Sequence, residues 1–122
     1  MKHPVLFIVF NRPKTTKLVF EAISEYQPQR LYIAADGPRH ESDEERCKQV
    51  RSLVENITWN CEIKTLFRDE NVGCRVAIVS AIDWLFKKEE RGIILEDDCL
   101  PSQSFFSFCD EMLARFSEHE SI

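Results

Sequence analysis

The 122-residue sequence lacks several features that would point to a particular class of protein. Its longest apolar run, Val5 to Phe10, is far shorter than the ~20 residues that a membrane-spanning helix needs, and residues 1–4 do not form a signal peptide. Basic residues are also not in excess, because 16 lysines and arginines against 21 acids give a net charge of −5. Binding to nucleic acid needs a basic face, so we expect no nucleic-acid partner. The short apolar run and the lack of a signal peptide predict a cytoplasmic location.

The sequence has no cysteine pattern typical of a disulfide framework or a zinc site. Its five cysteines are odd in number and widely spaced: Cys47, Cys61, Cys74, Cys99 and Cys109. Each falls on or next to an apolar face of an expected helix or strand. We therefore predict that they are reduced and mostly buried as small hydrophobic side chains, with a reactive thiol as the alternative.

Repeats, linkers and low-complexity stretches are absent too, so the chain is predicted to form one domain. The domain is expected to span residues 1–116, followed by a flexible polar tail at residues 117–122. The apolar pattern switches repeatedly between the period of a strand and the period of a helix. This alternation is typical of an α/β fold with a mainly parallel sheet and helices on both faces.

Four strands and four helices are predicted from this pattern. The strands are Val5–Phe10, which is continuous and suited to the sheet centre, Leu31–Ala35, the half-exposed or edge segment Cys61–Phe67, and Gly92–Leu95. The helices begin near Pro13, near Asp43, after Gly73 and near Pro101. The first helix is expected to bury Leu18, Val19, Ala22, Ile23 and Tyr26, and the last to turn Asp110 toward solvent.

Three consecutive acids, Glu96, Asp97 and Asp98, follow the fourth predicted strand. Carboxylates are costly to bury without a cation or partners, and hard oxygen ligands suit Mg²⁺ or Mn²⁺. A divalent ion held there can in turn hold a diphosphate. The alternative is that the three acids only stabilise the N-terminus of the following helix through its dipole.

Polar residues follow all four predicted strands, at the edge where ligands bind in open α/β sheets. They are Asn11 and Arg12, then Asp36 and Arg39, then Arg68 and Asn71 with Gly73, and finally the acidic trio. Arginines can bind phosphate or stack on a base, and a carboxylate can accept from a base N–H or a ribose hydroxyl. Each motif alone is equally compatible with a helix cap or a turn, but their joint placement predicts a nucleotide-diphosphate pocket with a metal ion.

The ordered set of motifs resembles a known enzyme family. The segments PVLFIVFNRP, IAADGPR, FRDENVGCRVAIVSAIDWLF and GIILEDDCLPSQSFFSFC resemble the N-terminal, nucleotide-binding half of bacterial GT-A-fold nucleotide-diphospho-sugar transferases. These enzymes are similar in outline to N-acetylglucosaminyltransferase I. The resemblance covers nearly the whole chain and implies a Rossmann-like GT-A fold, truncated after its donor-binding part.

The resemblance also implies roles for individual residues. The acidic trio corresponds to the DXD motif of the family, so Asp98 is the expected direct ligand of Mn²⁺ or Mg²⁺, with Glu96 and Asp97 in support. Asp36 is expected to accept from the imide of a nucleobase, uracil in the first instance, and Arg12 to lie against the nucleotide. Arg75 is a weaker candidate for contact with the diphosphate.

The expected function is metal-dependent transfer of a hexosyl or N-acetylhexosaminyl group from a UDP-sugar to an unknown saccharide acceptor, with bacterial surface polysaccharide as the implied context. The inner face of the membrane is the implied alternative location. No catalytic base can be named, because in this family the acceptor half and the base follow the DXD strand, here beyond Ile122. A non-catalytic or truncated nucleotide-binding module and a receiver-like phosphoacceptor domain are the alternatives.

Overall fold

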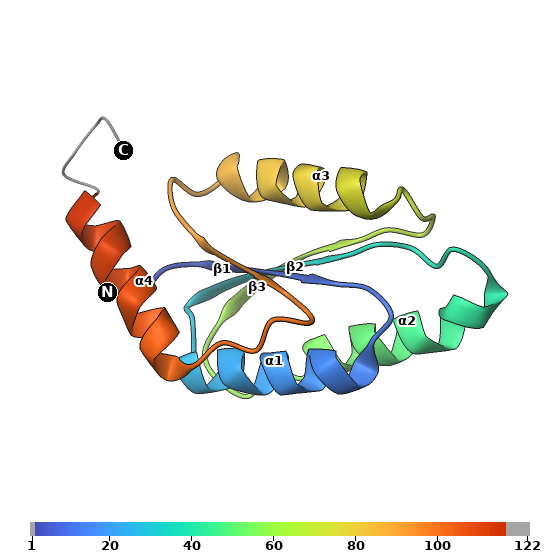
Figure 1. Cartoon of the computed structure of the whole chain (residues 1–122), viewed down its shortest axis with the longest axis horizontal. Helices are drawn as coiled ribbons and strands as arrows, with labels where there is room; N and C mark the ends of the chain where they lie inside the picture. Colours follow the sequence, from blue (N-terminus) through green and yellow to red (C-terminus); the bar gives the residue numbers. More distant parts are fainter. Residues whose placement is uncertain (1, 117–122) are drawn as a thin grey trace.

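A computed structural model describes residues 2–116, and the predicted flexible tail at residues 117–122 lies outside these residues. Strands and helices alternate along the chain, as the sequence predicts (Figure 1). Their bounds are β1 (Val5–Val9), α1 (Pro13–Tyr26), β2 (Arg30–Ala35), α2 (Glu41–Val54), β3 (Glu62–Phe67), α3 (Cys74–Phe86), β4 (Ile93–Glu96) and α4 (Gln103–Phe116). The predicted α/β class is therefore confirmed.

The four strands form one parallel sheet in the order β3-β2-β1-β4. Every residue of β1 is buried, because this strand is paired on both sides and covered on both faces. The order matches strands 3-2-1-4 of a Rossmann fold, and the point at which the strand order reverses lies between β1 and β4. A receiver domain has β1 next to β3, so the receiver-like alternative is wrong.

Helices cover both faces of the sheet: α3 lies on one face and α1 and α2 lie on the other (Figure 1). Successive side chains of β1 point to opposite faces, so Val5, Phe7 and Val9 pack in one apolar cluster and Leu6 and Ile8 in another. The second cluster contains Ala81 and Leu85 of α3. This double cover explains why the sequence of β1 is apolar without alternation.

Helix α1 fixes the direction in which the chain leaves the central strand. It begins at Pro13, whose fixed φ suits a first turn, and ends before Gln27, which has a φ of 57°. The predicted burial of Leu18 is wrong, since 52% of this residue is exposed. Each helical residue is rotated by about 100° from the previous one, so a stripe through Val19 and Ile23 turns Leu18 away from the sheet.

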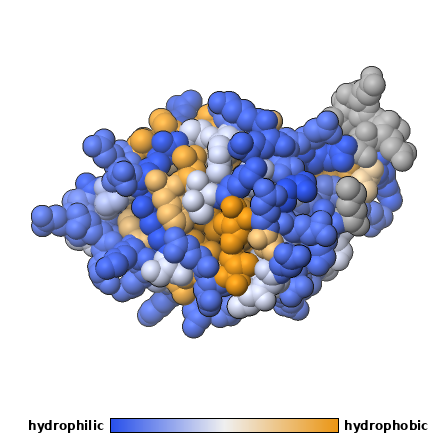
Figure 2. Space-filling model, turned by 180° about the vertical axis from the view of Figure 1, so that it is seen from behind, coloured by the Kyte–Doolittle hydropathy of each residue, from blue (hydrophilic) through white to orange (hydrophobic). Residues whose placement is uncertain are grey.

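Strands β3 and β4 are the two edges of the sheet formed by residues 2–116. The prediction that β3 is an edge is confirmed, and Ile63 is exposed there. Figure 2 looks at the molecule from behind, where β3 lies nearest, and shows apolar side chains gathered near the middle of a mostly polar surface. No helix within residues 2–116 has the length and apolar character needed to span a membrane.

The cysteines are free, as predicted, but the expectation that they are mostly buried is wrong. Only Cys47 is buried, whereas Cys61 and Cys109 are half-buried and Cys74 and Cys99 are exposed. Cys74 is the first residue of α3 and Cys99 follows β4, so neither lies in the interior of a helix or strand. An apolar neighbourhood in the sequence does not bury a residue at such a position.

Helix α4 lies beside α1 and is anchored by a polar contact that the sequence does not reveal (Figure 1). Asp110 is half-buried rather than solvated: it accepts hydrogen bonds from the Tyr26 hydroxyl at 2.6 Å and from the backbone N–H of His3 at 3.2 Å. The Tyr26 ring stacks on Phe106 with the centroids 4.3 Å apart. Burial, together with the bond to Asp110, raises the pKa of Tyr26.

Candidate functional site

The carboxyl ends of the four parallel strands meet at one edge of the sheet, next to a cleft of about 380 Å³. The cleft is lined by Ile8, Val9, Phe10, Asn11, Arg12, Asp36, Arg39, Asn71, Gly73, Cys74, Ala77, Ile78, Glu96, Asp97 and Asp98. It includes the reversal point between β1 and β4, where open α/β sheets bind ligands. Most of the residues predicted from the sequence therefore come together in one place.

The acidic end of the cleft follows β4. Oxygen atoms of Glu96 and Asp98 and the sulfur of Cys99 lie within 4.8 Å of one another. The guanidinium Nη1 of Arg12 lies 3.6 Å from Oδ2 of Asp98, and both side chains are more than half exposed. The two carboxylates offer hard oxygen donors that suit Mg²⁺ or Mn²⁺. The Cys99 thiol donates to Asp98 Oδ1 at 3.5 Å, and this bond raises the pKa of the thiol.

Asp97 is half-buried and differs in environment from its two neighbours. Burial raises the pKa of its carboxyl, and the charges of Asp98 and Glu96 act in the same direction, while Arg12 opposes them. The three carboxylates thus repel one another at close range. A cation bound among them would relieve this repulsion.

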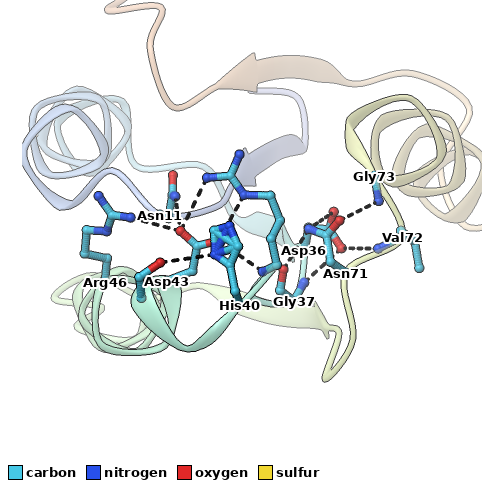
Figure 3. Close-up of polar contacts among 11 residues, drawn as sticks. Asn11, Asp36, Gly37, His40, Asp43, Arg46, Asn71, Val72 and Gly73 are labelled. Carbon is cyan, nitrogen blue, oxygen red and sulfur yellow. Dashed lines mark hydrogen bonds and ion pairs between the residues drawn. The ribbon is translucent and has the colours of Figure 1, made fainter.

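The opposite end of the cleft is organised by Asp36, which follows β2 and is only 8% exposed. Its Oδ1 accepts from the backbone N–H groups of Gly37 at 2.8 Å and Val72 at 3.0 Å, and its Oδ2 accepts from the Asn71 amide at 3.0 Å (Figure 3). A carboxylate has about four acceptor positions, so one position on Oδ2 is left. Asp36 therefore fixes the loop after β3 and keeps room for a single ligand donor.

The loop between β3 and α3 is shaped by Asn71 and Gly73. The Asn71 amide donates to the Gly37 carbonyl at 2.9 Å, and its Oδ1 accepts from the Gly73 N–H at 3.1 Å. Gly73 has a φ of 89°, a conformation that side chains disfavour, which explains the glycine before the first residue of α3. The positive end of the α3 dipole is thereby directed at the cleft.

Asp43, in the first turn of α2, is the most important site residue that the sequence reading missed. Its side chain is 0% exposed, yet it accepts from Asn11 Nδ2 at 2.9 Å, Arg39 Nε at 3.0 Å and Arg46 Nη2 at 2.9 Å (Figure 3). The hydrogen bonds from Arg39, and after them that from Asn11, hold the pKa of Asp43 well below its usual range against the opposing effect of burial. The sequence does place Arg39 four residues before Asp43 and Arg46 three residues after it. This spacing could have indicated the ion pairs, but it is also typical of exposed ion pairs on a helix surface.

Two predicted arginines lie outside the cleft lining. Arg68 donates to the Ser80 hydroxyl at 2.8 Å, and Arg75 is exposed on the first turn of α3. Arg51, which was not predicted, donates to the carbonyls of Asp36 at 3.2 Å and Arg68 at 2.6 Å. It therefore ties the ends of β2 and β3 to α2 from behind the cleft.

A larger groove of about 690 Å³ runs between α1 and α2 and is more open than the cleft. Lys14, Lys17 and Lys48 line it, together with Glu45. It includes no carboxyl end of a strand and none of the predicted site residues. We therefore place the functional site at the smaller cleft.

The fold and the cleft define a parallel α/β protein with the strand order 3-2-1-4 of a Rossmann fold and a charged cleft at the carboxyl ends of its strands. Comparisons with protein-family profiles, with curated proteins and with solved structures give no match. The fold and the chemistry of the cleft therefore carry the functional argument.

Proposed function

We propose that this chain binds a nucleotide-diphosphate sugar together with a divalent cation, as the donor-binding part of a glycosyltransferase of the GT-A type. UDP is the proposed nucleotide carrier and Mn²⁺ or Mg²⁺ the proposed ion. A hexosyl or N-acetylhexosaminyl group would be passed to a saccharide acceptor in the cytoplasm or at the inner face of the membrane.

The observation that carries this proposal is the acidic end of the cleft, with Arg12 beside Asp98. Carboxylate oxygens of Glu96 and Asp98 would hold the ion, while the Arg12 guanidinium lies close enough to Asp98 to reach an oxygen of the same diphosphate. The chemistry that a divalent ion supplies when bound is neutralisation of the charge on the diphosphate leaving group. Neighbouring carboxylates alone would repel a diphosphate.

The strand order supports one orientation of the nucleotide. Neighbouring strands are about 4.8 Å apart, so the end of β2 lies roughly 10 Å from the end of β4, with β1 between them. Asp36 follows β2 and the acidic trio follows β4. The base would therefore lie near Asp36 and Asn71, and the diphosphate near Asp98, with the ribose passing Asn11.

Calorimetric titration with UDP tests the proposal. In the presence of Mn²⁺ we expect binding, and in EDTA we expect it to be lost, because the diphosphate then meets the acids without a bridging cation. Equal UDP affinity in both conditions would contradict the proposal that a cation bridges the diphosphate and the acids. An absence of binding in both conditions would contradict the proposal that the chain binds UDP.

A further inference from the structure

Arg39 is held in one orientation by Asp43. Its Nε donates to Asp43 Oδ2 at 3.0 Å and its Nη2 lies 3.4 Å from Oδ1, and its backbone N–H donates to Oδ2 at 3.0 Å. The guanidinium carbon lies over the Phe10 ring, 5.2 Å from its centroid. A carboxylate on one edge and a ring on one face restrict a side chain that would otherwise be free to move.

The held guanidinium still has donors to offer. An arginine has five N–H groups, of which the Asp43 carboxylate uses two, so three are left for a ligand. Arg39 is 54% exposed and lines the cleft. Arg12 also lines the cleft but stands beside Asp98, at the other end. Arg39 is thus the preorganised cation at the Asp36 end.

We propose that Asp43 is a positioning residue that holds Arg39 as a donor to a carbonyl oxygen of the nucleobase, so that Arg39 and Asp36 together read the base. This inference rests on the proposed function and goes beyond it, because it assigns base selection to a buried residue outside the cleft lining. Asp43 acts through Arg39 and does not touch the ligand.

The chemistry of this pair selects a ring N–H next to a carbonyl. Asp36 can accept only from a donor, and its remaining acceptor position is on Oδ2. Arg39 can only donate. Uracil presents an imide N–H between two carbonyl oxygens, whereas the corresponding edge of adenine presents a ring nitrogen acceptor and an amino donor. Adenine would place its ring nitrogen against Asp36, two acceptors facing each other, and its amino group against Arg39, two donors facing each other.

The test is the affinity for UDP and for ADP, each measured with Mn²⁺, in the wild type and in the variants Arg39→Gln and Asp43→Asn. We expect the wild type to prefer UDP, and both variants to lose roughly tenfold in UDP affinity, the factor that one charge-assisted hydrogen bond is worth. ADP affinity should stay unchanged. Because both variants act on one contact, the double variant should bind UDP no more weakly than Arg39→Gln alone.

Arg46→Gln is the matched control. It removes another partner of Asp43 but lies outside the cleft lining, so UDP affinity should stay the same. If Asp43→Asn does not fold, Arg39→Lys continues the test, because lysine keeps the charge but cannot make the paired contact with Asp43. Its UDP preference should be lost.

Several results would overturn the inference while leaving the proposed function in place. One is a wild type that binds UDP and ADP with equal affinity, and another is an equal loss of affinity for both nucleotides in the variants. The others are a full preference for UDP in Arg39→Lys and a folded Asp43→Asn variant that binds UDP with normal affinity. A wild type that binds neither nucleotide would instead overturn the proposed function.

Discussion

Asp36 and Asp43 are both buried acids, yet they leave different amounts of their hydrogen-bonding capacity for a ligand. Asp36 accepts mainly from backbone N–H groups and keeps one position on Oδ2. Asp43 accepts from five donors on Asn11, Arg39 and Arg46 and lies away from the cleft lining. The first can contact a ligand directly, whereas the second can act only through its neighbours.

Replacing Asp98 by alanine should abolish metal-dependent UDP binding without unfolding the protein. The substitution removes one of the three mutually repelling carboxylates, and the exposed ion pair with Arg12 contributes little to stability. The melting temperature should be unchanged or raised, and calorimetry with Mn²⁺ should show no UDP binding. Asp69→Ala is the control, because Asp69 is an exposed acid outside the cleft. If the Asp98 variant unfolds, the result would instead favour a role of the acidic trio in capping the following helix.

Acid should weaken the contribution of Asp43 to stability. Its pKa is lowered in the folded protein, so the contribution is complete above about pH 4, the ordinary range of an aspartate, and is lost as the pH falls through the lowered value. We expect Asp43→Asn to be less stable than the wild type at pH 7, and the difference to shrink at pH 3. Urea unfolding at both pH values measures it, and a difference independent of pH would contradict the assignment.

At the scale of elements, the site depends on two loops that touch. The loop after β2 contains Gly37, and the loop after β3 contains Glu70 and Asn71. A Cβ atom on Gly37 would lie 2.5 Å from the backbone carbonyl carbon of Glu70, closer than atoms can approach. The glycine therefore allows the contact that brings Asn71 to Asp36.

Gly37→Ala should separate these loops. We expect a loss of about 1–3 kcal/mol in the free energy of unfolding, as is usual for overpacking, together with weaker UDP binding. Gly92→Ala is the control, because its Cβ would meet the flexible Leu85 side chain at 2.8 Å, away from the cleft. That variant should keep its UDP affinity. Normal UDP affinity in Gly37→Ala would show that the loop contact does not shape the site.

At the scale of the whole molecule, the residues that could assist catalysis are limited. Beyond β4, the described chain consists of a short connection and helix α4. Asp110 of α4 is engaged by Tyr26 and His3, and it lies outside the cleft lining. Under the proposed function, the described residues would supply groups for a donor and a cation, and no described residue of α4 lines the cleft to serve as a base for an acceptor hydroxyl.

We expect the 122-residue chain to transfer little or no sugar, even where it binds the donor. Transfer needs an acceptor hydroxyl about 3–3.5 Å from the anomeric carbon, and an inverting reaction also needs a positioned base. An assay with a UDP-sugar, Mn²⁺ and a panel of saccharides measures transfer, while release of UDP without acceptor measures slow hydrolysis. Robust transfer would show that residues assigned here to structure, or a second copy of the chain, form the acceptor site.

The sequence by itself determined the elements whose patterns are local. The unbroken apolar run of β1 predicted a strand covered on both faces, the alternation in β3 predicted an edge, and Pro13 and Gly73 predicted two helix starts. The polar residues after each strand predicted the cleft for a simple reason. Parallel strands place their carboxyl ends at one edge, so the strand assignments alone bring those residues together.

Only the tertiary structure decided which charges face the cleft and which are used inside the fold. How the helices rest on the sheet decides that Asp43 is buried, that Asp110 is half-buried against Tyr26, and that Arg68 turns toward Ser80. It also decides the exposure of Leu18, Cys74 and Cys99. A sequence pattern fixes the face of an element on which a residue lies, but not what packs against that face. What packs against each face is determined by contacts between side chains that are distant in the sequence.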